Sequence, residues 1–215
     1  MGISRVLAAA ALGAVLGSGA ALGEGGRAGA FDYYVLALSW TPSWCAAEGD
    51  RRGAPRCGER GLGWSLHGLW PQHERGWPSD CRTDRRAPSR AETAAQADLF
   101  GSGGAAWHQW RKHGSCSGLS AAAYFALARA AYDAARRPDV LRGLDRLVTL
   151  PAAVVEEAFL EADPRLHPDG VTVTCRDGRV AEVRLCLDRD LAPRRCGADV
   201  RRDCTLPDAA LPPVR

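Results

Sequence analysis

Residues 171–187 read Val-Thr-Val-Thr-Cys-Arg-Asp-Gly-Arg-Val-Ala-Glu-Val-Arg-Leu-Cys-Leu. The two arms of this stretch, residues 171–174 and 180–187, are rich in β-branched and aliphatic side chains, which favour strands. Between the arms lies Asp177-Gly178, and an Asp-Gly pair favours the tight turn that joins two antiparallel strands. The stretch therefore predicts a β-hairpin in the last quarter of the chain.

Two further strands are predicted near the other end of the chain. Residues 31–40 are aromatic and aliphatic, and residues 63–69 form a shorter, mixed strand. Helical signals occupy the middle of the chain, where Ser120 is a suitable N-cap and Pro138 a suitable terminator. Helices are predicted over residues 88–100, 105–112, 120–137 and 151–160. Strands at both ends with helices between them indicate an α+β fold.

The composition suits one globular domain. The chain has 215 residues, of which 46% are hydrophobic and 25% charged, and this excludes collagen-like, coiled-coil and largely disordered proteins. A net charge of +3 is too small to indicate nucleic-acid binding by itself. Lys112 is the only lysine among 28 basic residues. This single ammonium is therefore a candidate functional group.

Residues 1–23 are predicted to form a signal peptide. Arg5 supplies a positive start, residues 6–16 are an uncharged apolar run, and small residues follow. The run is shorter than the ~20 apolar residues that span a bilayer, although a retained N-terminal anchor is the alternative. We expect cleavage between residues 20 and 30. The expected product is an exported protein, periplasmic or secreted, with residues 31–215 as a single domain and no membrane attachment.

The cysteines support an oxidising compartment. An even number in an exported chain predicts disulfides, although eight cysteines allow 105 pairings. Zinc binding is the alternative, but the chain has no C-x2-C pair. The Gly-, Arg- and Pro-rich residues 46–63 are predicted as a loop, and the tail 187–215 as a disulfide-linked loop. The cysteines are Cys45, Cys57, Cys81, Cys116, Cys175, Cys186, Cys196 and Cys204.

Four of the five histidines fall in or next to two short motifs. Residues 64–71 read Trp-Ser-Leu-His-Gly-Leu-Trp-Pro, and residues 107–116 read Trp-His-Gln-Trp-Arg-Lys-His-Gly-Ser-Cys. An α-helix advances about 100° per residue, so a helix over the second motif would gather its polar residues within an arc of roughly 140°. The residues on that face are His108, Gln109, Lys112 and His113.

This set of groups suits metal-free phosphodiester transfer. Two imidazoles can divide the proton work, because one removes a proton while the other supplies one near neutral pH. An ammonium beside them can neutralise charge on a phosphoryl oxygen and favours a neutral neighbouring imidazole. A substrate with a 2′-hydroxyl brings its own nucleophile, and RNA is such a substrate.

The two motifs resemble the active-site signatures of the ribonuclease T2 family. The resemblance extends to the strand ending at Ser39-Trp40 and to the Cys-x-Asp-Gly hairpin that begins at Cys175. It implies an α+β fold with an antiparallel central sheet and packed helices. It also implies four disulfides, pairing Cys45–Cys57, Cys81–Cys116, Cys175–Cys204 and Cys186–Cys196.

The resemblance assigns roles to the motif residues. His67 would be the general acid, His113 the general base, Lys112 the group that stabilises the phosphoryl centre, and His108 a phosphate ligand. It implies cleavage of single-stranded RNA with low base specificity, through 2′,3′-cyclic phosphates to 3′-phosphate ends. No metal or other cofactor is implied, and we expect a monomer.

Two positions depart from the family pattern. Gln109 replaces a glutamate, and an amide can donate a hydrogen bond but cannot act as an acid or base. We therefore expect a lower or pH-shifted rate. Gln72 stands where the family places part of a base site, often with an acidic residue. Trp70, at the position where the family stacks a base, and Trp77, in a polar loop, are the other candidate base contacts.

Two alternatives compete with this interpretation. One is a catalytically weakened protein that binds RNA or another partner on the same fold. The other is a metal-dependent phosphoesterase with His67, His108 and His113 as ligands, although few acidic residues accompany them in the motifs. Trp64, Trp70, Trp107 and Trp110 are interpreted as core aromatics first.

Overall fold

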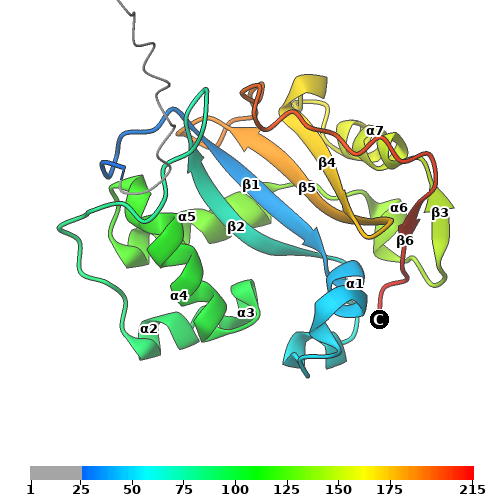
Figure 1. Cartoon of the computed structure of the whole chain (residues 1–215), viewed down its shortest axis with the longest axis horizontal. Helices are drawn as coiled ribbons and strands as arrows, with labels where there is room; N and C mark the ends of the chain where they lie inside the picture. Colours follow the sequence, from blue (N-terminus) through cyan, green and yellow to red (C-terminus); the bar gives the residue numbers. More distant parts are fainter. Residues whose placement is uncertain (1–25) are drawn as a thin grey trace, which may run out of the picture.

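A computed structural model describes residues 26–215, so the predicted signal peptide lies outside the described residues. Its centre is an antiparallel sheet in which four long strands lie in the order β2-β1-β5-β4 (Figure 1). Two short strands, β6 and β3, continue the sheet from the beginning of β5. The strands are β1 Tyr33–Trp40, β2 Trp64–Gln72, β3 Val148–Leu150, β4 Val171–Arg176, β5 Arg179–Leu187 and β6 Ala209–Leu211.

Most of the helices lie between β2 and β3 in the chain. The helices are α1 Thr41–Trp44, α2 Arg90–Ala94, α3 Ala97–Phe100, α4 Gly103–Lys112, α5 Ala121–Ala134, α6 Asp139–Arg142 and α7 Ala152–Ala162. Shorter helical turns are the π-helix η1 Cys45–Gly49 and the 3-10 turns η2 Pro55–Gly58, η3 Gly114–Ser117 and η4 Pro168–Gly170. Within residues 26–215, none of these helices has the length and apolar character needed to cross a membrane.

The predicted strands and the predicted hairpin are confirmed, and three other segments differ from the prediction. The predicted helix over 88–100 is broken at Gln96 into α2 and α3. The prediction of a loop over residues 46–63 is wrong in part, because η1 and η2 occupy it. The tail contains β6, which pairs with β3, and neither strand has a pattern long enough to be recognised.

The two faces of β1 explain where the core ends and an open cleft begins. Tyr34, Leu36, Leu38 and Trp40 belong to the main core, which lies between the sheet and the helices α5 and α7 (Figure 1). Successive side chains of a strand alternate between faces, so the odd-numbered residues point the other way. There the segment 196–200 covers one end of the sheet, and the other end, around Ser39, lines a cleft.

Helix α5 fixes the position of β2 through two tyrosines. Tyr124 donates a hydrogen bond of 2.9 Å to the carbonyl of Leu69, and Tyr132 donates one of 3.0 Å to the carbonyl of Trp64. Ser120 caps the helix, as predicted, by accepting a hydrogen bond from the amide of Ala123. The two tyrosines therefore hold β2 on both sides of its histidine.

All eight cysteines form disulfides, in the pairing that the family resemblance implies. The bonds are Cys45–Cys57, Cys81–Cys116, Cys175–Cys204 and Cys186–Cys196. Cys116 lies three residues after His113, and Cys81 lies in the long loop that follows β2. This bond therefore ties the second histidine motif to the loop that leaves the first.

Candidate active site

His67 projects from a β-bulge at the centre of β2. Ala37 of β1 pairs with Gly68, and the next residue, Leu38, pairs with Leu66, so His67 is left without a partner on β1. A bulge bends the strand and re-aims the side chain at the extra position. The imidazole of His67 is accordingly exposed, whereas its neighbours Leu66 and Gly68 are buried.

A carboxylate and a guanidinium from β5 stand behind His67. The Nδ1 atom of His67 is hydrogen-bonded to the carboxylate of Glu182. Arg184 donates two hydrogen bonds to the same carboxylate, of 2.9 and 3.1 Å. Burial raises the pKa of Glu182, but the hydrogen bonds and charges of His67 and Arg184 outweigh it and hold that pKa below its ordinary value. Glu182 is therefore an ionised partner for the imidazole.

His113 lies at the end of α4, on the other side of Trp70. The helix ends at Lys112, and His113 is its C-cap, so the predicted helical face stops one residue early. The indole of Trp70 stacks on His113 with ring centroids 5.2 Å apart, and it meets His67 edge-on at 5.0 Å. The imidazoles of His67 and His113, one from each motif, therefore contact the same indole.

His113 is held in its neutral form. Burial lowers the pKa of His113 to about 3, and Lys112, His67 and His108 act in the same direction. Burial, followed by the charges of Lys112 and Arg111, also lowers the pKa of His108. The Nδ1 atom of His113 is buried and has no hydrogen-bond partner among the described residues. A buried, uncharged imidazole of this kind can accept a proton.

Gln109 contacts Trp70 and is not free to turn. Its Oε1 atom accepts a hydrogen bond of 2.9 Å from the indole Nε1 of Trp70. The bond passes over Gly68, where a β-carbon would collide with both Oε1 of Gln109 and Nε1 of Trp70. Because the oxygen is engaged, the amide NH2 is left as the group that can meet a substrate.

The site opens into a cleft of about 810 Å³. His67, His108, Gln109 and Glu182 line it, together with residues of α1, η1 and β4. Lys112 lies close to both histidines of its motif, because its charge lowers the pKa of His108 and that of His113. Lys112 forms no ion pair within residues 26–215, so its ammonium is available for an anion.

Gln72, Trp77 and Trp107 all lie outside the lining of the cleft. Gln72 is 6% exposed and does not line the cleft, so its base contact stays a prediction. Trp107 is 41% exposed, so its interpretation as a core residue is wrong. Trp77 is 53% exposed, as predicted, but lies outside the lining of the cleft. Trp64 and Trp110 are buried.

Two site residues were missed by the sequence patterns. Glu182 and Arg184 alternate with Val183 and Leu185, so a strand there predicts that both lie on one face. That signal does not show which residue they face. They face His67 because β1 lies between β5 and β2, and this strand order is set by pairing between segments far apart in the sequence.

The three histidines do not gather as metal ligands. Within residues 26–215, the group of possible ligand atoms close enough to share an ion consists of Cys45, Asp50 and Cys57, and it includes no histidine. Cys45 and Cys57 are joined in a disulfide, so their sulfur atoms are not thiolates. The geometry therefore does not favour the metal-dependent alternative.

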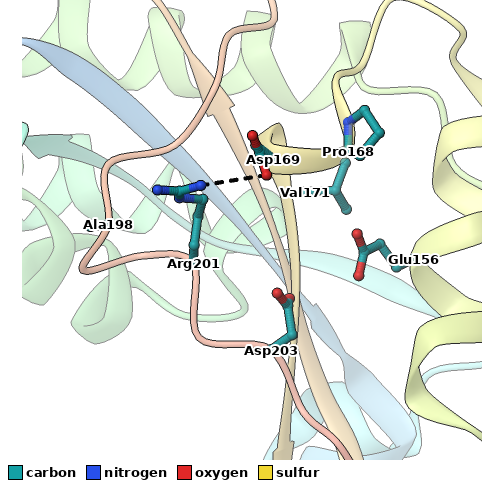
Figure 2. Close-up of a pocket in the computed structure, with 7 residues that line it drawn as sticks. All are labelled: Glu156, Pro168, Asp169, Val171, Ala198, Arg201 and Asp203. Carbon is teal, nitrogen blue, oxygen red and sulfur yellow. Dashed lines mark ion pairs between the residues drawn. The ribbon is translucent and has the colours of Figure 1, made fainter.

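A second, smaller pocket of about 290 Å³ shares no lining residue with the cleft (Figure 2). It is acidic, because Glu156, Asp169 and Asp203 line it, and Arg201 is paired with Asp169 at 3.5 Å. Burial, then the charges of Asp203, Glu157 and Asp169, raise the pKa of Glu156 to about 7. A carboxyl in this state binds a proton more tightly in the folded chain than in the unfolded one.

Glu156→Gln is expected to stabilise the protein at pH 8 and not at pH 4. The raised pKa means that stability is full below pH 4.5 and falls as pH rises towards about 7. After allowance for solvent screening, removing the charge adds about 1 kcal/mol at pH 8, or about 2–4 °C in Tm. Thermal unfolding at both pH values measures this. A gain at pH 4 equal to that at pH 8, or the same gain in Glu157→Gln, would contradict it.

Comparisons with known proteins agree with the motifs. The model of the ribonuclease T2 family matches residues 31–196. A ribonuclease of Aeromonas hydrophila is 48% identical over 95 residues, which are 44% of this chain and 42% of that protein. A probable ribonuclease of Haemophilus influenzae is 33% identical over 129 residues, or 54% of this chain and 47% of that protein. The matched regions thus span about half the length of these relatives.

Solved structures share the fold. An RNase-related protein from Calystegia sepium matches with a TM-score of 0.68 at 20% identity, covering 85% of this chain and 97% of that one. RNase NT, solved in complex with 5′-AMP, matches with a TM-score of 0.59 at 22% identity, covering 85% and 98%. The predicted α+β fold is therefore confirmed. The motifs, the shared fold and the match over residues 31–196 together show that this chain belongs to the ribonuclease T2 family.

Proposed function

We propose that this protein is an endoribonuclease that cleaves single-stranded RNA without a metal, through 2′,3′-cyclic phosphates to 3′-phosphate ends. One observation carries the proposal. A neutral, buried His113 and an exposed His67 with an ionised carboxylate behind it contact the same indole, that of Trp70. Two imidazoles in different environments are suited to opposite proton-transfer roles.

In the first step, His113 takes the proton of the 2′-hydroxyl, and the 2′-oxygen attacks phosphorus. The bond from phosphorus to the 5′-oxygen breaks, and His67 gives that oxygen a proton. Because Nδ1 of His67 is engaged by Glu182, Nε2 is the ring nitrogen left to donate. In the second step the roles reverse: His67 removes a proton from water, the water attacks the cyclic phosphate, and His113 protonates the departing 2′-oxygen.

Lys112 and His108 act on the phosphate in this proposal. The unpaired ammonium of Lys112 offsets the negative charge that grows on the phosphoryl oxygens in the transition state. His108 lines the cleft on the exposed side of α4 and is placed to bind a phosphate oxygen. The amide NH2 of Gln109 supplies a further donor, where a glutamate would have to be protonated to do the same.

Low base specificity is supported by the kinds of side chain near the histidines. Trp70, a predicted base contact, is stacked on His113, and Gln72 is buried. Trp77 stays a predicted, sequence-tolerant stacking contact on the surface. RNase NT, which shares the fold, was solved with 5′-AMP bound, in keeping with a nucleotide ligand for this fold.

We also propose that the protein acts outside the cytoplasm. Its four disulfides are typical of chains that mature in an oxidising compartment. Export through the predicted signal peptide would bring the chain to such a compartment. We propose that the mature protein is a monomer.

The decisive experiment is incubation of the purified oxidised protein with single-stranded RNA in excess EDTA. His113→Ala, prepared in parallel, is the control for contaminating nucleases. Transient 2′,3′-cyclic phosphate ends from the wild type alone would support the two-histidine mechanism. Loss of activity on adding EDTA would favour metal-dependent chemistry instead. Binding of RNA without cleavage between pH 4 and 8 would favour the catalytically weakened binding protein.

Gln109→Glu is expected to move the acidic limb of the pH–rate profile to higher pH. The new carboxylate would lie beside Trp70 and near His113, where a negative charge favours the imidazolium and so raises the pKa of His113 from about 3. The measurement is kcat/KM for a dinucleoside phosphate between pH 3 and 8. An unchanged profile would remove any catalytic role for position 109.

A further inference from the structure

We propose that the cleft contains a second binding site, which holds the RNA strand beyond the scissile phosphate; this rests on the proposed function. We call it the distal subsite and define it as Trp44, Arg52, Arg56 and Arg176, all of which line the cleft. Its ligand class is a single-stranded oligonucleotide, recognised through phosphate oxygens and a stacked base.

Arg176, one residue of the distal subsite, lies across the sheet from His67. Glu182, which contacts His67, pairs in register with Thr174 of β4, and Arg176 follows two residues later on that strand. β2 and β4 are separated by β1 and β5 (Figure 1). Three spacings of about 4.8 Å place β4 ~14 Å from β2. A dinucleotide held at His67 would leave this part of the cleft open, and a longer strand could enter it.

Arg56 is a fixed cation without a matching anion. Its guanidinium donates hydrogen bonds to the carbonyls of Asp98 and Leu99, at 3.4 and 3.1 Å, and forms no ion pair with a described residue. The carboxylate of Asp98 is instead paired with Arg129 at 2.9 Å. Arginine keeps its charge even when partly buried. Arg56 therefore places a positive charge at the wall of the cleft without a direct ion pair.

Arg52 and Arg176, which also line the cleft, share one carboxylate. Glu48 is 2.8 Å from Arg52 and 2.5 Å from Arg176. Glu48 thus holds two guanidiniums side by side, and Arg176 also lies 3.8 Å from Asp177. The four charges balance, so what this pair offers a ligand is its unused N–H donors. Planar guanidinium donors of this kind match the oxygens of a phosphodiester.

An aromatic surface accompanies these charges. Trp44 lines the cleft, is partly exposed, and packs closely over Gly49, where an added β-carbon would lie 2.8 Å from the indole. Aromatic rings interleaved with basic groups bind single strands, because every base can stack and every nucleotide carries a phosphate. The combination favours a nucleic-acid strand over a simple anion.

Disulfides make the distal subsite rigid before a ligand arrives. Trp44 and Arg56 immediately precede the two bonded cysteines Cys45 and Cys57, and Arg176 immediately follows Cys175, which is bonded to Cys204. A site whose groups are already in position loses less entropy on binding. Three of the four residues are therefore held by cross-links.

The test measures how affinity depends on strand length and salt. The probes are 2′-O-methyl RNAs, a dinucleotide and a decamer, which the enzyme cannot cleave because the attacking hydroxyl is blocked. Arg56→Gln and Arg176→Gln are compared with the wild type. The matched control is Arg142→Gln, because Arg142 is exposed, paired with Asp139 at 3.0 Å, and outside the cleft.

We expect each cleft variant to weaken decamer binding about tenfold and to lower the slope of log Kd against log salt by about 0.7. Dinucleotide binding should change less than twofold, and Arg142→Gln should match the wild type with both probes. Arg56 also supports α3, so Arg176→Gln keeps the test valid if Arg56→Gln does not fold.

Two outcomes would overturn the distal subsite. The first is that Arg176→Gln binds the decamer with the same Kd and the same salt slope as the wild type. The second is that the cleft variants lose affinity for the dinucleotide and for the decamer by the same factor. Cleavage of an unmodified dinucleoside phosphate by the wild type is measured in parallel. That assay decides the proposed function alone, so failure of the catalytic assignment and failure of the distal subsite give different results.

Discussion

His67→Ala is expected to lower kcat on RNA by about 10²–10⁴-fold and to lower it far less on a nucleoside 3′-(4-nitrophenyl phosphate). The 5′-oxygen of RNA is a poor leaving group and must be protonated as it departs. A nitrophenolate leaves without a proton, so the proposed general acid is not needed for that substrate. Steady-state kinetics on both substrates measure the difference.

His113→Ala supplies the contrast. The proposed base removes the 2′-proton from either substrate, so its loss should lower kcat on both by about the same factor, again about 10²–10⁴-fold. Equal losses on both substrates in His67→Ala, or selective loss on RNA in His113→Ala, would reverse or refute the assignment of acid and base.

Glu182→Gln is expected to lower kcat on RNA by about 10–100-fold, the usual cost of losing a residue that orients a functional histidine. Glu182 acts through His67, because its carboxylate is hydrogen-bonded to the imidazole and is itself held by Arg184. An amide keeps the shape of the side chain but removes the negative charge that stabilises an imidazolium. The KM should change little, because Glu182 is behind the reacting histidine.

The leaving-group comparison separates positioning from general structural support. If Glu182 serves the proposed acid, Glu182→Gln should retain most of its activity on the nitrophenyl ester, as His67→Ala does. A structural defect would lower both activities together and would also lower the midpoint of thermal unfolding. Equal losses on the two substrates would therefore contradict the positioning role.

Local patterns were enough for much of the fold and for the histidine motifs. The hairpin at Asp177-Gly178 and the capped helix after Ser120 depend on residues close together in sequence, and both are present. His67, His108 and His113 were found because each motif is short and chemically unusual. Turns, helix caps and short catalytic motifs can be recognised in this way because the residues that define them are neighbours in the sequence.

The missed features depend on contacts between distant segments. The pairing of Glu182 with His67 joins residues 115 positions apart and needs the order of three strands. The bulge that exposes His67 follows from the register of β1 on β2. The exposure of Trp107 follows from how α4 packs, since its composition gives no sign of which aromatic faces solvent.

The bond between Cys81 and Cys116 links catalysis to the redox state of the chain. It anchors the turn that begins directly after His113, and that turn helps to place the imidazole against Trp70. In a reduced chain that lacks this bond, we expect the imidazole of His113 to have no fixed position. Such a chain should cleave RNA slowly. Oxidation would then assemble the site, so that we expect the proposed activity to appear only once the bond between Cys81 and Cys116 has formed.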